Sequence, residues 1–330
     1  MRYTLQWHIT HRCNLRCQHC YQEEYESFAE YRALLEVLDK YCRFLERHGH
    51  EGQINLTGGE PLTSRNFFPL CREIAARGIP FSILTNGTLI DDRTALRIAA
   101  LSPLFVQVSI DGTEHTHDRI RGRGTYEMAF RGIDALRRFG VPVLVAFTAQ
   151  KGNRHQLAEV AEECIRHDVN LLWWDRVVTE NGESRKKLAL TTPQFQRLVR
   201  QSGRLHRRYR RPDGKSPVGC GRSLQFLACP ENPGYVCSAG KSLVAITADG
   251  SVMPCRRLPH VIGNIRDGEL DEILGASPLI REINAAPVPE ECAGCRHLEK
   301  CGGGSRCVTF GQTGELFAGD VNCRLKKQKQ

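Results

Sequence analysis

The stretch LQWHITHRCNLRCQHC (residues 5–20) places an alternation of apolar and polar residues directly before three cysteines, Cys13, Cys17 and Cys20. The alternation over residues 5–10 predicts a β-strand. The cysteines follow with the spacing C-x3-C-x2-C, one ligand short of a closed structural zinc site or a fully ligated iron–sulfur cubane. The stretch therefore predicts a metal-binding loop at the end of a strand, with one corner of the metal site left open.

Five further strand-then-helix patterns follow this strand. The expected strands cover residues 5–10, 53–57, 81–85, 104–111, 141–149 and 170–175, and the expected helices cover 30–48, 65–77, 91–101, 125–139, 153–167 and 192–208. Six such units in order imply an α/β fold with a parallel sheet and helical crossovers, either a barrel or a doubly wound sheet.

The polar residues of these strands fall on one face. They are Gln6, His8, Thr10, Asn55, Thr57, Gln107, Ser109, Asp111 and Thr148. Successive side chains of a strand point to opposite sides, so the apolar set is expected under the helices and the polar set inside. A sealed barrel core of apolar side chains does not suit this lining. The pattern favours an open, partial barrel that holds a polar ligand.

The composition is that of a globular protein, with 330 residues, 41% hydrophobic and 25% charged. No apolar run approaches the ~20 residues of a membrane span, and the N-terminus lacks the features of a signal peptide, so a cytoplasmic protein is expected. Fifteen cysteines in a reducing compartment indicate metal binding or catalysis rather than disulfides.

The net charge of +9 has one concentrated source. Five arginines recur at helical spacing: Arg197, Arg200, Arg204, Arg207 and Arg211. Such a stripe is either a solvated helix face, a docking surface for an acidic peptide, or a contact for nucleic acid.

The pattern changes after Arg211. Residues 212–219, PDGKSPVG, have the composition of a linker, and the segment beyond them holds nine cysteines, many glycines and a predicted hairpin over 243–255. We therefore expect a barrel domain over residues 1–211 and a small cysteine-rich domain over 212–330, stabilised by metal clusters.

Four motifs in order now resemble the radical S-adenosylmethionine (SAM) superfamily: CNLRCQHCY, TGGEP (57–61), TNG (85–87) and VSIDG…HDRIRG (108–122). The resemblance implies a partial (β/α)6, TIM-like barrel and a [4Fe–4S] cluster held by Cys13, Cys17 and Cys20. The amine and carboxylate of SAM would then chelate the open iron. Reductive cleavage of SAM would give a 5′-deoxyadenosyl radical that abstracts a substrate hydrogen.

The same resemblance suggests cofactor-binding residues. Gly58, Gly59 and Glu60 would hold the SAM amine, and Ser109 and Arg121 would reach its carboxylate with Asp111 close by; a guanidinium suits a carboxylate chemically. Ser109 and Asp111 could instead serve turn geometry after their strand. No catalytic acid or base stands out. His8, beside the predicted cluster, is a weak candidate that is equally explained as part of the polar lining.

The tail resembles a SPASM domain, which normally holds two auxiliary iron–sulfur clusters. The resemblance implies that the distal cluster is bound by Cys292, Cys295, Cys301 and Cys323. The cluster nearer the active site would be bound by Cys237 and Cys255. Two departures stand out. Ser305 occupies a position where the family has a cysteine. Either Cys307 takes over as the ligand, or the nearer cluster is under-ligated. Arg256 replaces the catalytic aspartate of sulfatase maturases, which argues against formylglycine formation.

Cys229 or Cys220 could supply a further ligand to the nearer cluster, or both could be core residues. The expected function is oxidative modification of a ribosomally made peptide or protein side chain, such as a thioether or another cross-link, with a donor such as flavodoxin or ferredoxin. Because the chain starts on its first strand, leader recognition is expected either in a separate protein or, if the substrate needs no leader recognition, not at all. Two alternatives stay open: a small-molecule or tetrapyrrole substrate, and a zinc protein that binds nucleic acid. A membrane is not expected as a partner.

Overall fold

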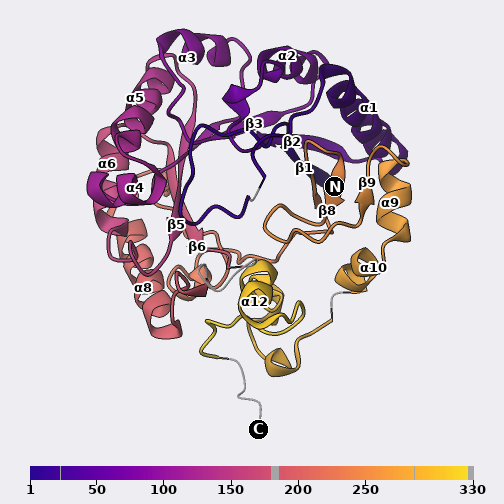
Figure 1. Ribbon diagram of the computed structural model, residues 1–330. Helices are drawn as coiled ribbons and strands as arrows, with labels where there is room; N and C mark the ends of the chain where they lie inside the picture. The colour runs from indigo at the N-terminus through magenta and orange to yellow at the C-terminus, as the bar shows by residue number, and fades with distance from the viewer. Residues whose placement is uncertain (23, 180–185, 286, 326–330) are drawn as a thin grey trace.

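The computed structural model describes residues 1–22, 24–179, 186–285 and 287–325, and one curved sheet organises them (Figure 1). The strand order is β6-β5-β4-β3-β2-β1-β7-β8-β9. The strands are β1 (Arg2–His8), β2 (Glu51–Thr57), β3 (Phe81–Thr85), β4 (Val106–Ser109), β5 (Val143–Ala149), β6 (Leu171–Arg176), β7 (Leu243–Ile246), β8 (Ser251–Met253) and β9 (Gly263–Asn264). β1 to β6 are mutually parallel, which confirms the predicted partial barrel.

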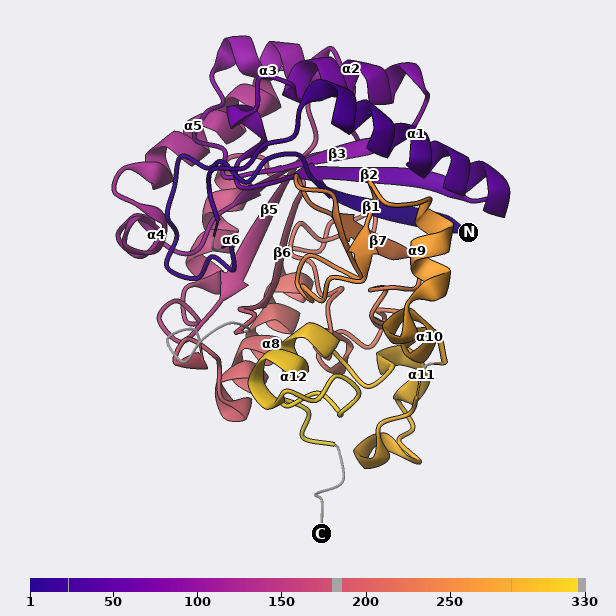
Figure 2. The same ribbon diagram turned by 45° about the vertical axis from the view of Figure 1, so that its right-hand side comes forward.

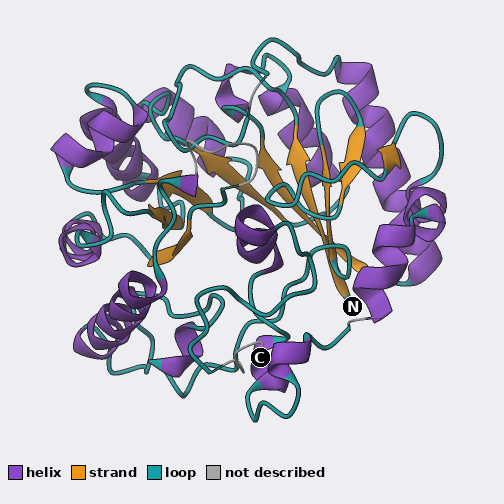
Figure 3. Cartoon of the chain, turned by 60° about the horizontal axis from the view of Figure 1, so that its bottom comes forward, coloured by secondary structure: helices purple, strands orange, loops and turns teal. Residues whose placement is uncertain are grey.

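Helices cover the outside of this sheet as an arc, with the strands fanning out inside it (Figures 1 and 3). The barrel helices are α1 (Tyr31–His48), α2 (Phe67–Ala76), α3 (Asp92–Ala99), α4 (Glu114–Arg121), α5 (Thr125–Arg138), α6 (Leu157–Arg166) and α8 (Thr192–Arg208). All six predicted helices are present. The short helix α4 was not predicted, because it lies in a segment that the sequence pattern assigned to the loop after β4.

The predicted alternation of the strands holds in the structure. The apolar set, which includes Leu5, Trp7, Ile54 and Val108, is fully buried in the core beneath the helices. Burial of such side chains contributes about 1.5–3 kcal/mol each and fixes the register, because a one-residue slip would expose the whole set. The opposite face of the strands is thereby turned toward the barrel interior.

The tail continues the same sheet. β7 and β8 form the predicted hairpin, and β7 also pairs in parallel with β1, from Thr4 opposite Leu243 to Trp7 opposite Ile246. This pairing was not predicted. The described helices of the tail are α9 (Leu270–Ala276), α10 (Pro278–Ala285), α11 (Leu298–Cys301) and α12 (Arg306–Thr313), with the short 3-10 turns η2 (Gln225–Leu227) and η3 (Glu290–Cys292). A further 3-10 turn, η1 (Pro61–Thr63), follows β2 in the barrel.

The tail lies across the open side of the barrel, where α12 sits between the β6–α8 edge and the α9–α10 end (Figures 1 and 2). Ion pairs from Arg43 and Arg47 of α1 to Glu269 and Asp271 join the barrel to α9. Division of the chain at residues 211/212 stays a prediction. Within the described part of the chain, no helix combines the length and the apolar character needed to cross a membrane.

Candidate functional site

A cavity of about 190 Å³ opens at the carboxyl ends of the parallel strands. Its wall on one side is the cysteine loop that follows β1, with Cys13, Cys17 and Cys20. Opposite lie polar residues from the strand ends; among them are Thr57, Gln107, Ser109 and Thr148. The three predicted cluster ligands and four of the predicted inward-facing polar residues therefore meet in one place, whereas Gln6, His8, Thr10, Asn55 and Asp111 are not among the described lining residues.

The cysteine loop is held in position by the TGGEP loop. The Gly59 N–H donates to the Thr10 carbonyl at 2.8 Å, and the Glu60 N–H donates to the Arg12 carbonyl at 2.8 Å. A Cβ atom at Gly58 would lie 2.4 Å from the Thr10 oxygen, and one at Gly59 would lie 2.4 Å from the Arg12 oxygen. Both positions thus require glycine so that the two loops can approach closely.

A second loop fixes the cysteine loop from the other side. The Asn86 side-chain amide donates to Asn14 Oδ1 at 2.9 Å, and Asn14 in turn donates to Thr88 Oγ1 at 2.9 Å. Asn14 lies within the C-x3-C spacing, and Asn86 belongs to TNG (85–87). The two loop motifs therefore orient the cysteines.

The three cysteines are half-buried and lie beside a cation. Arg121 Nη1 is 3.8 Å from Cys17 Sγ. Burial raises the pKa of Cys13 to about 11, and burial also raises the pKa of Cys17. Thiolates in this site therefore need a positive partner, and three sulfur donors around one accessible cavity fit an iron–sulfur cluster with an open iron.

Glu60 is fully buried and is not among the described residues that line the cavity. Its carboxylate accepts hydrogen bonds from Thr85 Oγ1 at 2.8 Å and from the backbone N–H groups of Asn86 and Leu62 at 2.7 and 3.2 Å. Burial outweighs these bonds and raises the pKa of Glu60 to about 7. Its predicted contact with the SAM amine stays a prediction.

Asp111 and Arg121 form a buried ion pair at the cavity wall. Arg121 Nε donates to Asp111 Oδ2 at 2.7 Å, while the Thr148 N–H donates to Asp111 Oδ1 at 2.8 Å. Burial acts to raise the pKa of Asp111, but Arg121 and nearby His19 more than offset it, so the pKa falls below its ordinary value. Asp111 thus fixes Arg121, which lines the cavity. The contact of Arg121 with the SAM carboxylate stays a prediction.

The far side of the cavity is rich in arginine. Asp175 Oδ2 accepts from Arg257 Nη1 at 2.5 Å and from Arg222 at 3.2 Å, and despite burial these cations lower the pKa of Asp175. Arg256 lies next to this group and contacts Thr57 Oγ1 at 3.4 Å. Among the described residues, no carboxylate forms an ion pair with Arg256. Arg256 was predicted to be notable from the sequence, whereas Arg222 and Arg257 were not, although the run CRRLP (255–259) was a signal for Arg257.

His8 lies behind the cavity wall rather than in it. Its side chain is buried, and Nε2 has no hydrogen-bond partner among the described residues. Burial, together with Arg256 and His11, lowers the pKa of His8 to about 3, so the imidazole is neutral at physiological pH. A role for His8 as an acid or base stays a prediction.

The four cysteines predicted for the distal cluster meet around a second, small cavity of about 20 Å³ with an apolar lining. Cys292, Cys295, Cys301 and Cys323 all line it, beside Phe226 and Leu298. Burial raises the pKa of Cys301 to about 12, and neighbouring Asp320, Cys323 and Cys292 add to the shift. Four thiols in one apolar pocket fit a fully ligated cluster.

Three further cysteines gather between the two cavities. Burial raises the pKa of Cys237, and the Cys307 thiol nearby raises it further. Burial likewise raises the pKa of Cys255 to about 11, with contributions from Cys307 and Cys237. Ser305, at the expected cysteine position, instead places Oγ 3.4 Å from Cys307 Sγ. The geometry therefore favours Cys307 as the third ligand of the nearer cluster.

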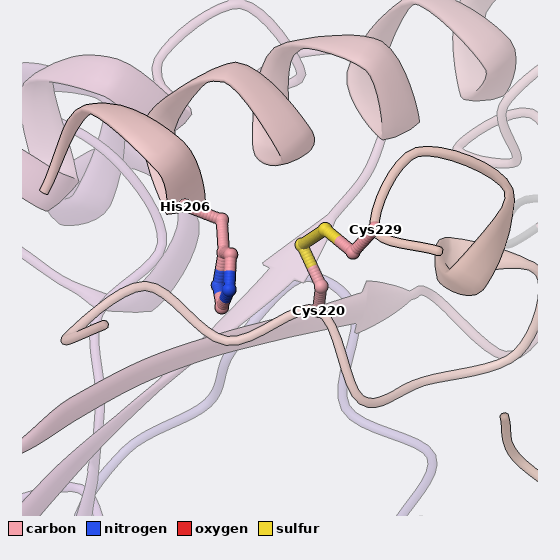
Figure 4. Close-up of side chains that lie close together, drawn as sticks. All are labelled: His206, Cys220 and Cys229. Carbon is pink, nitrogen blue, oxygen red and sulfur yellow. A yellow bond between two sulfur atoms is a disulfide. The ribbon is translucent and has the colours of Figure 1, made fainter. Parts of the chain in front are cut away.

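Cys220 and Cys229 are both buried and lie against each other, joined as a disulfide, with His206 of α8 beside them (Figure 4). From the sequence, either cysteine was predicted to be a further cluster ligand, or both to be core residues. His206 was not predicted, because its place on the helix before the cysteines was its only signal in the sequence.

Comparison with known proteins agrees with this geometry. Residues 7–164 match the family model of the radical SAM superfamily, and residues 237–296 match the SPASM model, an iron–sulfur cluster-binding domain. The chain is 27% identical to pre-heme d1 synthase of Dinoroseobacter shibae, covering 97% of this chain and 85% of the relative. It is 26% identical to the mycofactocin maturase MftC of Mycolicibacterium smegmatis, covering 97% and 82%.

Solved structures share the fold. SuiB of Streptococcus suis, bound to S-adenosylmethionine, superposes with a TM-score of 0.78 at 17% identity, covering 98% of this chain and 77% of SuiB. The enzyme anSMEcpe with bound AdoMet and a peptide superposes with a TM-score of 0.75 at 19% identity, covering 98% and 94%. These matches set aside the zinc protein that binds nucleic acid. The chain therefore carries a radical SAM domain over residues 7–164 and a SPASM domain over residues 237–296, and these domains imply a [4Fe–4S] cluster with SAM and auxiliary iron–sulfur clusters.

Proposed function

We propose that this enzyme oxidatively modifies a side chain of a ribosomally made peptide or protein, for example by forming a thioether or another cross-link. Its relatives include both a mycofactocin maturase and a pre-heme d1 synthase, so the similarity does not identify the substrate. The observation that carries the peptide substrate is the arginine stripe on α8.

The stripe is exposed and lacks partners of opposite charge. α8 buries Phe195, Leu198 and Val199 and turns Arg200 and Arg204 outward. Arg197 is exposed as well, and among the described residues no carboxylate forms an ion pair with these three arginines. A helix face with several uncompensated guanidinium groups attracts an acidic segment and accelerates its association, which supports docking of an acidic leader peptide.

Within the site, the residues of this chain have separable tasks. Cys13, Cys17 and Cys20 would hold the cluster, and Arg121, fixed by Asp111, would hold the SAM carboxylate. The bound cluster and SAM supply a carbon-centred radical that removes a hydrogen atom. Arg256 and Trp173, which line the far side of the cavity, would contact the substrate.

The cysteines of the tail would hold auxiliary clusters, which would supply acceptors for the further electron that an oxidative modification must release. Cys237, Cys255 and Cys307 would hold the cluster nearer the active site, and Cys292, Cys295, Cys301 and Cys323 would hold the distal one. A donor such as flavodoxin or ferredoxin would reduce the SAM-binding cluster, and a separate leader-binding protein would present the peptide.

The deciding experiment is mass spectrometry of candidate precursor peptides after anaerobic incubation with SAM and a reductant. We expect the loss of two hydrogen atoms from the peptide together with formation of 5′-deoxyadenosine. Arg200→Glu/Arg204→Glu should raise the KM for an acidic precursor by about tenfold or more, since each reversed charge repels the leader. The matched control, Arg72→Glu/Arg93→Glu, reverses two exposed charges on α2 and α3 and should leave the KM unchanged.

A second candidate is a carboxylated tetrapyrrole. The arginine-rich side of the cavity favours an anionic substrate, and relatives include a pre-heme d1 synthase and an Fe-coproporphyrin III synthase of Methanosarcina barkeri. Incubation with iron coproporphyrin III distinguishes the two proposals. Conversion of this porphyrin, with kinetics indifferent to the α8 charge reversal, would replace the peptide proposal.

A further inference from the structure

A further group of potential metal ligands lies outside the three iron–sulfur sites, between the edge of β6 and α8 (Figure 4). One ring nitrogen of His206 and the sulfurs of Cys220 and Cys229 all lie within 4.8 Å of one another. Cys220 and Cys229 are 3% and 1% exposed. Two thiols and an imidazole at this spacing are the donor set of a single thiophilic ion such as zinc.

The backbone fixes the positions of the two sulfur donors, Cys220 and Cys229. Leu172 of β6 donates its N–H to the Pro217 carbonyl at 2.7 Å and accepts from the Gly219 N–H at 2.7 Å, so the segment before Cys220 continues the sheet edge. The loop then returns through η2, and the Cys229 N–H donates to the Gln225 carbonyl. The two sulfurs are thus brought face to face by local structure rather than by flexible side chains.

The orientation of His206 leaves one nitrogen for a metal. Nδ1 lies 2.6 Å from the Val218 carbonyl, which can only accept a hydrogen bond, so the ring proton belongs on Nδ1. Nε2 then carries the lone pair, and Glu231 Oε1 lies 3.5 Å from it. Two ligands of one tetrahedral zinc ion are separated by roughly 3.3–3.8 Å, and hydrogen bonding of the second ring nitrogen to a carbonyl is usual for zinc-binding histidines.

Further hydrogen bonds support the sulfur of Cys220. Ser202 Oγ accepts from Trp174 Nε1 at 2.8 Å, which leaves its own proton to be donated to Cys220 Sγ at 3.4 Å. Asn232 donates to the Cys220 carbonyl at 2.9 Å. Such bonds to a sulfur stabilise its thiolate form and orient it as a ligand.

We propose that His206, Cys220 and Cys229 bind a zinc ion, with Glu231 in the fourth position. This site clamps the segment before the SPASM domain to α8 and the last barrel strand. Its thiols bind one ion, whereas the cysteines of a cubane bind different irons and stand further apart. The inference concerns a structural ion and rests only on the residues around α8, not on the proposed peptide substrate.

The proposed site requires the reduced form of the cysteine pair. Two electrons and two protons from a dithiol reductant convert the disulfide to two thiols, and binding of zinc then releases those two protons. Thiol–disulfide exchange with that dithiol carries out the reduction, so protein prepared anaerobically with the reductant holds the thiol pair.

The test is elemental analysis of protein purified anaerobically with a dithiol reductant and supplied with zinc alone. We expect about one zinc per chain in the wild type, and its loss in Cys220→Ser/Cys229→Ser with no change in iron. Cys164→Ala is the matched control, because it removes a buried cysteine of α6 and should keep the zinc. Zinc-edge X-ray absorption should show two sulfur neighbours at about 2.3 Å.

A milder variant protects the test against misfolding. His206→Gln keeps both cysteines and should weaken zinc binding by at least tenfold while the iron content and helical content stay normal. Loss of about four irons on removal of Cys220 and Cys229 would overturn the proposal and make them auxiliary-cluster ligands. Absence of zinc from the reduced wild type, with both thiols open to alkylation, would overturn it as well.

Discussion

The cysteine loop after β1 and the cysteine pocket of the tail differ in their number of cysteines and in their surroundings. Cys13, Cys17 and Cys20 are half-buried, number three, and face a polar cavity of about 190 Å³ with Arg121 in its wall. The tail pocket has four cysteines, a volume of about 20 Å³ and an apolar lining. An incomplete set beside open, charged space leaves an iron for a reacting cofactor, whereas a complete set in apolar surroundings suits a cluster that only transfers electrons.

Removing the open set should have the largest effect. Cys13→Ala/Cys17→Ala/Cys20→Ala should abolish 5′-deoxyadenosine formation, because no other described cysteine lines that cavity. Iron should fall from about 12 to about 8 atoms per chain, since the tail pockets are separate. Chromatography of nucleoside products and iron analysis measure both. The control Cys164→Ala should leave 5′-deoxyadenosine formation and the iron content unchanged. SAM cleavage by the triple variant would contradict the assignment of these three cysteines to the SAM-cleaving site.

The middle set of cysteines tests where the boundary between the two kinds of site lies. Cys307→Ala should remove about four irons and reduce product formation by at least a hundredfold, while SAM cleavage continues. Ser305→Ala, two residues away, should keep the iron if Cys307 takes the place of the missing cysteine, as proposed. Iron analysis with turnover of the modified substrate gives the answer. A loss of iron from the Ser305 variant and not from the Cys307 variant would reverse the assignment.

The sequence predicted the open site better than the tail, for physical reasons. Alternation and helix periodicity are local, so the strands and the polar ends at Thr57, Ser109 and Thr148 followed directly. The pairing of β7 with β1 joins segments more than 200 residues apart, and alternation does not specify a partner strand. The neighbours of Asp175 were missed for the same reason, because Arg222 and Arg257 reach it only in the folded chain.

Arg121 tests how the open site binds the carboxylate of SAM. Arg121→Gln should weaken SAM binding by about 10- to 100-fold, because it removes the charge that faces the cofactor carboxylate and leaves Asp111 buried without its main partner. Arg121→Lys should recover part of the loss. Anaerobic equilibrium dialysis measures the Kd. Arg119→Gln, an exposed neighbour on the same helix, is the control and should bind SAM normally. Unchanged affinity in Arg121→Gln would place the carboxylate elsewhere.

Glu60 gives the smallest expected effect and tests whether the open site extends behind its wall. Its folded pKa of about 7 lies above the ordinary value, so its stabilising contribution is full below the unfolded pKa and is lost as pH rises toward 7. Glu60→Gln should therefore flatten the fall in apo-protein stability between pH 5 and 8, measured by urea unfolding at each pH.

The same carboxyl distinguishes a cofactor ligand from a purely structural group. A cationic amine favours ionised Glu60, so the wild-type Kd for SAM should rise up to about tenfold between pH 8 and pH 6, as protons compete. Comparison with Glu60→Gln subtracts the ionisation of SAM itself. If wild type and variant keep the same pH dependence of the Kd while their stability curves differ, Glu60 only holds Thr85 and Asn86 in place. The SAM amine would then be bound by other groups of the cavity lining, which includes Gly58 and Gly59 of the TGGEP loop.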